Sequence, residues 1–383
     1  WLKHVIPVLE RLSVPSPVVG GMPFAFVLSV LEGCGVMRVV FDSTLQTVLM
    51  LAFFTTIGMM ASLKLIGQGG KLLLGFLVSV TVLAVLQNVL GIAVTKLLGV
   101  DFHYAGSVSM MGGLGTSAAF GPNFEQLYGI TGGTVVAVTA ATFGMVAALV
   151  IGGPFGEWLI RKYKVRTPMT DPEIAAKLNV PEEVETDIID EHSAEHSTFT
   201  EQLLKAGGMI AICMALGTVV SHYLGQFITL PAYIGSMIVA AIVRNIADFT
   251  GKLKIDKVGL NAVADISLVL FVTMAINSLK LHELVNLALP LVVTLICQTI
   301  LMMAFAWGIL FMCFGRNFTA VMLTVGGIGF SMGATANGLA NMQALSEKYG
   351  QSPQAWLIVS IVGAFLIDLI NALIITSMAQ MPL

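Results

Sequence analysis

Charge is scarce in this chain: only 11% of its 383 residues are Asp, Glu, Lys or Arg. Soluble proteins carry roughly a quarter charged residues. Hydrophobic residues make up 56% of the chain, and the mean hydropathy is +0.90. This composition excludes an ordinary soluble domain and predicts an all-α polytopic membrane protein.

The chain also lacks closely spaced cysteine pairs, basic tracts and a histidine placed as in serine hydrolases. The four cysteines are scattered without a C-x-x-C pair, which indicates small core residues and not a disulfide or metal framework. Residues 329–333 match the G-x-S-x-G pattern of serine hydrolases, whose histidine follows the serine. Here the last histidine, His282, precedes Ser331. We therefore expect no enzyme, no bound cofactor and no nucleic-acid partner.

Two glycine-rich stretches interrupt the apolar sequence, at residues 112–123 and 326–337. The first holds four glycines and a proline in twelve residues, a composition that breaks an α-helix. At membrane depth such backbone is tolerated only where protein buries it or where it lines a wet cavity. Paired glycine-interrupted segments in two halves of a membrane protein indicate the binding site of a transporter.

A polar segment, residues 161–200, divides the chain into the halves 1–160 and 201–383. Gln87 in the first half corresponds to Gln298 in the second half. The motifs that match between the two halves are separated by 211 to 221 residues. A full apolar span precedes Pro231, but only sixteen residues precede Pro17. We therefore expect one further helix before Trp1, five spans in each half, and halves that are inverted relative to each other.

Charge placement supports this inverted repeat. With the linker in the cytoplasm, 16 of the 19 Lys and Arg residues fall on the cytoplasmic side, as the positive-inside rule requires. The C-terminus is then outside. Each glycine stretch becomes a re-entrant hairpin, at about residues 105–125 and 319–345, and the hairpins enter from opposite faces. Two such hairpins meeting near the midplane predict an alternating-access site.

The chain resembles the bacterial sodium/glutamate symporter family. The resemblance runs from about Pro15 to Ile375 and is carried by several motifs. They are residues 15–21 (PSPVVGG), 49–58 (LMLAFFTTIG), 87–88 (QN), 112–119 (GGLGTSAA), 151–154 (IGGP), 340–344 (ANMQA) and 362–372 (VGAFLIDLINA). The chain departs from the usual pattern of the family at Leu114, where a His is common, and at Ala336 and Asn337, where a Pro-Thr pair is usual.

The resemblance implies a homodimer in the bacterial inner membrane that imports glutamate with sodium as the coupling ion. It also implies a mobile core that moves against a fixed scaffold. Three alternatives remain open at this point. They are a sodium- or proton-coupled carrier of another small organic anion or amino acid, a channel, and an intramembrane hydrolase.

Candidate site residues come from the two glycine stretches and the last span. No Lys or Arg lies deep within a span, so an anion would depend on the N-termini of helices that begin at the breaks. Helix packing by small residues is the competing interpretation. We predict a substrate site formed by Gly113, Gly115, Thr116, Ser117, Gly329, Ser331, Thr335, Asn337 and Asn341.

A cation site is predicted in the last span, because an ionisable residue inside a membrane is functional by default. Asp368 lies near the middle of this span, and Asn371 shares its helical face. We expect both to bind sodium. Gln87, Asn88 and Gln298 lie near the middle of other spans, where coupling-ion binding and interhelical hydrogen bonding are both plausible.

Overall fold

The computed structural model describes most of the chain. The described residues are 16–37, 39, 41–99, 106–128, 132–171, 173–174, 176, 199–224, 232–251, 255–279 and 288–379. They form helices and connecting turns, with no strand among them. The expected helix before residue 1 and most of the 161–200 linker lie outside these residues and stay predictions.

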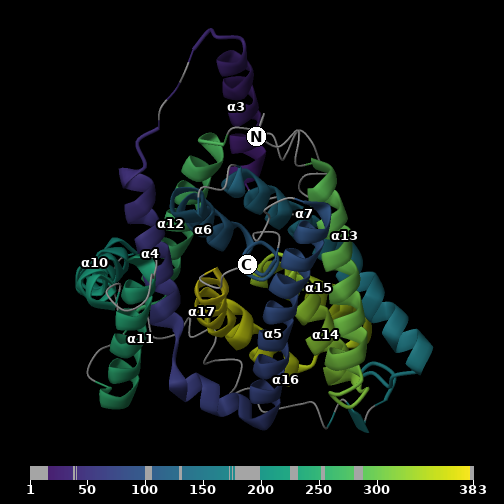
Figure 1. Cartoon of the computed structure of the whole chain (residues 1–383). Coiled ribbons are helices and arrows are strands. Elements are labelled where there is room, and N and C mark those ends of the chain that lie inside the picture. The colour runs from purple at the N-terminus through teal and green to yellow at the C-terminus, as the bar shows by residue number, and fades with distance from the viewer. Residues whose placement is uncertain are drawn as a thin grey trace.

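The first half contains five described helices (Figure 1). They are α3 (Ser16–Gly33), α4 (Thr44–Met60), α5 (Leu63–Leu98), α6 (Gly113–Tyr128) and α7 (Gly133–Tyr163). Within α5, Gly70 has φ 58° and ψ −152°, a conformation that a glycine adopts readily. This kink lets the first turns of α5 run across one end of the molecule before the long span begins (Figure 1).

The second half begins with the helix α10 (Phe199–Leu224), and further helices follow it. Its elements are α11 (Ala232–Thr250), α12 (Lys257–Asn277), α13 (Ala288–Phe305) with the π-helical continuation η2 (Ala306–Phe311), α14 (Phe318–Ser331), α15 (Thr335–Tyr349), α16 (Pro353–Ile361), the π-helical turn η3 (Val362–Leu366) and α17 (Ile367–Ala379).

Six helices of the described part are long and apolar enough to cross a membrane. They are residues 69–98, 133–163, 199–223, 233–250, 257–277 and 288–311. Four shorter apolar helices accompany them, at residues 16–32, 44–60, 318–331 and 367–378. The prediction of an all-helical membrane protein is therefore confirmed.

The helices pack mainly in two groups (Figure 1). In the first group α11 and α12 pack against both α4 and α10, and α12 also packs against α3. The second group is built around α14, which contacts α7, α15, α16 and η2. Every residue of α14 is buried, as expected for a helix that is apolar on all sides.

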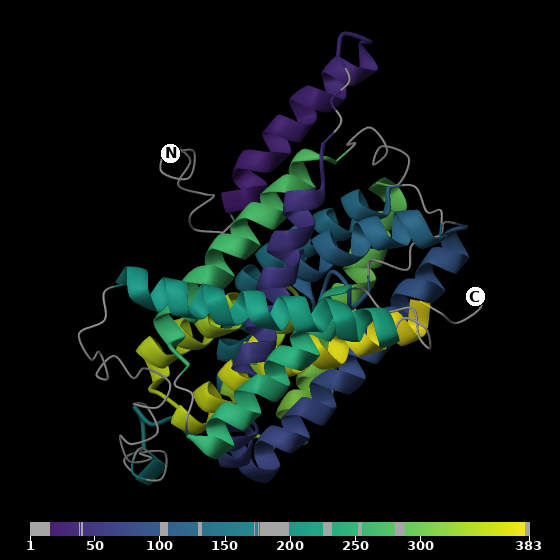
Figure 2. The same ribbon diagram turned by 90° about the vertical axis from the view of Figure 1, so that its left-hand side faces the viewer.

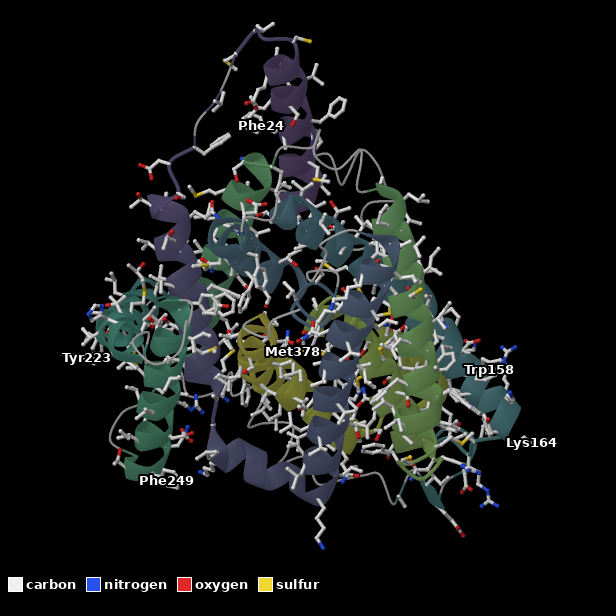
Figure 3. The ribbon with its side chains drawn as sticks, in the orientation of Figure 1. Phe24, Trp158, Lys164, Tyr223, Phe249 and Met378 are labelled. Carbon is white, nitrogen blue, oxygen red and sulfur yellow. The ribbon has the colours of Figure 1, made fainter. Side chains whose placement is uncertain are left out.

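The outer surface of the bundle is apolar. Figure 2 shows α10 lying across one face and α3 projecting beyond the rest. Exposed aromatic side chains lie around this surface, among them Phe24, Trp158, Tyr223 and Phe249 (Figure 3). Phe249 is 77% exposed and Tyr223 is 63% exposed. Such a surface suits contact with lipid and not with water.

Candidate substrate and ion site

A cavity of about 550 Å³ lies between the two helix groups. Its walls come from α3, α4 and α12 on one side and from both glycine stretches, α7, η3 and α17 on the other. The lining residues from the two glycine stretches are Met111, Gly112, Gly113, Leu114, Gly115, Thr116, Phe330, Gly333, Ala334, Thr335, Ala336, Asn337 and Ala340. The structure thus brings together two segments that are more than 200 residues apart in the sequence.

A helix begins at each glycine break, and both helix starts line the cavity. Helix α6 begins at Gly113 and α15 begins at Thr335. The first N–H groups of an α-helix have no partner within the helix, and the helix dipole adds partial positive charge at this end. The cavity therefore has two positions suited to a carboxylate.

The two breaks touch each other. Gly113 has φ +61°, and a Cβ atom at this position would lie 2.2 Å from the Gly333 carbonyl oxygen. A real side chain cannot approach that closely, and this conformation is also unfavourable for residues other than glycine. Glycine at 113 is therefore needed both for the turn and for the contact with the second break.

Thr335 is held by the π-helical turn before α17. Its Oγ1 donates to the Gly363 carbonyl oxygen at 2.5 Å, and Gly363 belongs to η3. A π-helical turn shifts the hydrogen-bond pattern of a helix, and such turns occur often at functional sites. This contact connects the start of α15 to the helix that carries Asp368.

Asp368 is the only charged side chain among the described residues that line the cavity. It lies in the first turn of α17 and is partly buried. Asn371, three residues further along α17, is fully buried and does not line the cavity. Its Nδ2 donates to the Ser107 carbonyl oxygen at 3.1 Å. Asp368 therefore faces the cavity, while Asn371 contacts the backbone that leads into the first break.

Some predicted substrate residues lie behind the cavity wall. Ser117 and Ser331 are fully buried, and neither is a lining residue. The Asn341 Nδ2 donates to the Ala148 carbonyl oxygen at 2.9 Å. At Gly329 an added Cβ would lie 2.2 Å from the Gly338 Cα, so this glycine permits α14 and α15 to pack closely. The predicted lining residues that do face the cavity are Gly113, Gly115, Thr116, Thr335 and Asn337.

The three predicted amide residues of the middle spans form buried hydrogen bonds. The Gln87 Nε2 donates to the Ser331 carbonyl oxygen at 2.9 Å, and the Gln298 Nε2 donates to the Gln87 carbonyl oxygen at 2.7 Å. Asn88 Oδ1 accepts from the Ser107 N–H at 2.7 Å. These bonds join α5 to α13 and to the backbone at both breaks.

The wall formed by α4 and α12 was missed by the sequence analysis. Four residues of α4 and four of α12 line the cavity here: Phe53, Phe54, Thr56 and Ile57, and Ala264, Leu268, Val269 and Val272. The ring of Phe54 stacks on the buried Tyr233, with centroids 4.1 Å apart. The signal for this wall was the LMLAFFTTIG motif, which carried the family resemblance but suggested no chemical role.

Charged side chains gather at the end of α7. Lys348, at the end of α15, forms an ion pair with Glu157 of α7, and this hydrogen bond raises the pKa of Lys348. The Lys162 ammonium lies 4.4 Å from the centroid of the Trp158 ring. Figure 3 places Trp158 and Lys164 together at this end of the molecule. The arrangement suits a membrane–water interface, where basic and aromatic side chains concentrate.

Comparison with known proteins identifies the family. Residues 1–351 match the model of the family described as sodium/glutamate symporter. The sodium/glutamate symporters of Escherichia coli (strain K12) and Shigella flexneri are each 36% identical to this chain over 387 residues, covering 100% of it and 94% of each relative. That of Haemophilus influenzae is 36% identical over 381 residues, covering 97% of this chain and 91% of the relative. The chain belongs to the sodium/glutamate symporter family, which is a family of transporters and not of enzymes.

Proposed function

We propose that this protein imports glutamate together with sodium and that the cavity between the two glycine breaks binds the glutamate. The observation that carries this proposal is the meeting of two helix starts, α6 and α15, at one cavity. Glutamate has two carboxylates, and two helix starts supply two separate positions for them. Thr116 and Thr335 line the cavity at these positions and would help to orient the substrate.

We propose that Asp368 and Asn371 contribute to a sodium site. A carboxylate offsets the cost of dehydrating a cation in an apolar interior. The Asn371 Oδ1 is buried and has no hydrogen-bond partner among the described residues, and the same holds for the Ser107 Oγ. Both are neutral oxygens of the kind that binds sodium. An ion held there would lie next to the cavity wall that Asp368 forms.

The finer architecture is also a proposal: two inverted halves, re-entrant hairpins, a cytoplasmic linker and an external C-terminus in the inner membrane of a bacterium. The shared order of elements supports it, as does the cross-packing of α4 on α11 and of α12 on α3. A cavity between two helix groups suits an elevator-like movement of one group against the other, with the group of α4, α11 and α12 as the dimeric scaffold.

Cysteine labelling tests the opposed hairpins. In a variant without the four native cysteines, Thr116→Cys should react with an impermeant thiol reagent mainly from outside. Ala336→Cys should react mainly from the cytoplasm, and substrate should protect both. Labelling of both positions from the same face alone would refute the inverted arrangement.

A second candidate substrate is a small organic anion other than glutamate. It is favoured by one observation: the positions that depart from the usual family pattern, Leu114, Ala336 and Asn337, all line the cavity. Counterflow in proteoliposomes with a panel of amino acids and dicarboxylates decides between the two. Exchange of labelled glutamate that only glutamate and close analogues compete for supports the first proposal. Preference for a dicarboxylate without an amino group supports the second.

A further inference from the structure

A fully buried side chain contacts the backbone where α14 ends. Gln87 of α5 donates its Nε2 hydrogen to the carbonyl oxygen of Ser331, the last residue of α14. The Gln87 Oε1 and the Ser331 Oγ are also buried, but neither has a hydrogen-bond partner among the described residues. Buried polar atoms without a partner are rare because they are costly, and a bound water or ion is one explanation for such an atom.

The end of α14 is electrically negative. The last carbonyl groups of a helix have no partner within the helix, and the helix dipole places partial negative charge there. The Phe330 oxygen accepts from the Met332 N–H and from the Gly333 N–H. The Ser331 oxygen accepts from the Gln87 Nε2 and keeps a second lone pair for another partner. Half-helix C-termini in discontinuous membrane helices bind coupling cations for this reason.

We propose that the end of α14, together with the Gln87 Oε1 and the Ser331 Oγ, binds a sodium ion that is separate from the one near Asp368. The inference rests on the proposed function in one respect, the choice of sodium as the ion. A similar arrangement occurs at Asn371 and Ser107: the carboxamide donates to the serine carbonyl, and neither its own oxygen nor the serine hydroxyl has a partner within the described part of the chain.

This position explains how sodium would promote substrate binding. Only residues 332–334 separate the end of α14 from the start of α15. A cation at the end of α14 would stabilise the break in the conformation that presents the start of α15 to an anion. The second break would then bind the cation on one side and the substrate on the other.

The test is a sodium titration of the purified, detergent-solubilised protein without glutamate, with thermal unfolding as the readout and choline as the reference cation. In Ser331→Ala and in Gln87→Met, half-maximal stabilisation should require about tenfold more sodium or more, because each change removes a neutral ligand. Thr324→Val is the matched control: Thr324 is buried in the same helix, but its hydroxyl donates to the Ala320 carbonyl oxygen. It should keep the wild-type midpoint.

Combining variants separates the two sites. Asp368→Asn alone should retain a sodium response, and adding Ser331→Ala should remove most of it. A wild-type sodium midpoint in both Ser331→Ala and Gln87→Met would overturn the inference and leave a buried water only, without affecting the proposed function. If the wild type showed no stabilisation specific to sodium, the inference would be wrong.

Discussion

The two glycine breaks differ in what precedes the helix that starts at each of them. At the second break α14 ends at Ser331 and α15 begins at Thr335, so one break presents both a helix end and a helix start. At the first break, residues 106–112 are turns, and only the helix start of α6 is presented. Both breaks can therefore bind an anion, but only the second has a helix C-terminus for a cation.

The contacts that hold the two breaks in place also differ. The second is held by helix contacts, with Gly329 against Gly338 and the Asn337 Nδ2 donating to the Met145 carbonyl oxygen at 3.0 Å. The first is held by side chains that hydrogen-bond to its backbone, from Asn88 and Asn371 to Ser107. Similar glycine motifs thus give two different structures: a helix leads into the second break, whereas turns lead into the first.

The largest loss of uptake is expected for a substitution at the point where the two breaks touch. Gly113→Ala places a Cβ against the Gly333 carbonyl oxygen and strains a positive φ, so it should separate the breaks. Misplacement of a binding group by about 1 Å can cost a factor of about 100. We expect uptake in proteoliposomes to fall by about that factor.

Gly153→Ala is the matched control for this experiment. It lies within α7, where an added Cβ meets nothing within 4 Å. Its uptake should equal that of the wild type. Near-normal uptake by Gly113→Ala, at equal amounts of inserted protein, would show that contact between the breaks is not needed for transport.

A smaller effect is expected at Asp368. Asp368→Asn keeps the shape of the side chain and removes its charge. If the carboxylate stabilises a bound sodium ion, the sodium concentration for half-maximal uptake should rise at least tenfold, about 1.4 kcal/mol of binding. A rival account makes Asp368 the partner of the substrate ammonium group.

Uptake of labelled substrates over a range of sodium concentrations separates these accounts. The rival account predicts that Asp368→Asn abolishes amino-acid transport but spares a dicarboxylate that lacks the amine. Unchanged sodium dependence in well-expressed protein would remove this residue from the sodium site.

The smallest effects are expected for threonine substitutions at the two helix starts, which can be compared directly with each other. Thr116→Ala and Thr335→Ala each remove the hydroxyl of a residue that lines the cavity, and Thr335→Ala also removes the hydrogen bond to the Gly363 carbonyl oxygen. One hydrogen bond to the substrate contributes about 1 kcal/mol, so each variant should raise the KM for glutamate about fivefold. Thr116→Ser and Thr335→Ser retain the hydroxyl and should behave as the wild type. An effect at only one position would mean that one break alone binds the substrate.

Much of this architecture could be predicted from the sequence. The breaks follow from glycine content within apolar runs, and the expectation that they lie close together agrees with the cavity that both of them line. Which hydroxyl faces the cavity could not be predicted. Thr116 lines it and Ser117 does not, because neighbouring helical residues point about 100° apart and the rotation of α6 is set by its packing.

The missed parts of the site share another cause. Phe53 and Phe54 are apolar residues of an apolar span, so nothing in their type distinguishes a cavity wall from a lipid-facing surface. The π-helical turn η3, whose Gly363 carbonyl accepts from Thr335, has no compositional signature. Its position depends on contacts between helices that are close in space and distant in sequence.

The most direct test of the central claim is an experimental structure of the protein with glutamate and sodium bound. We predict one glutamate in the cavity, with one carboxylate at the N–H groups of residues 114–115 and the other at those of residues 335–336. Glutamate bound outside this cavity, or held by one helix start with the other unoccupied, would contradict it.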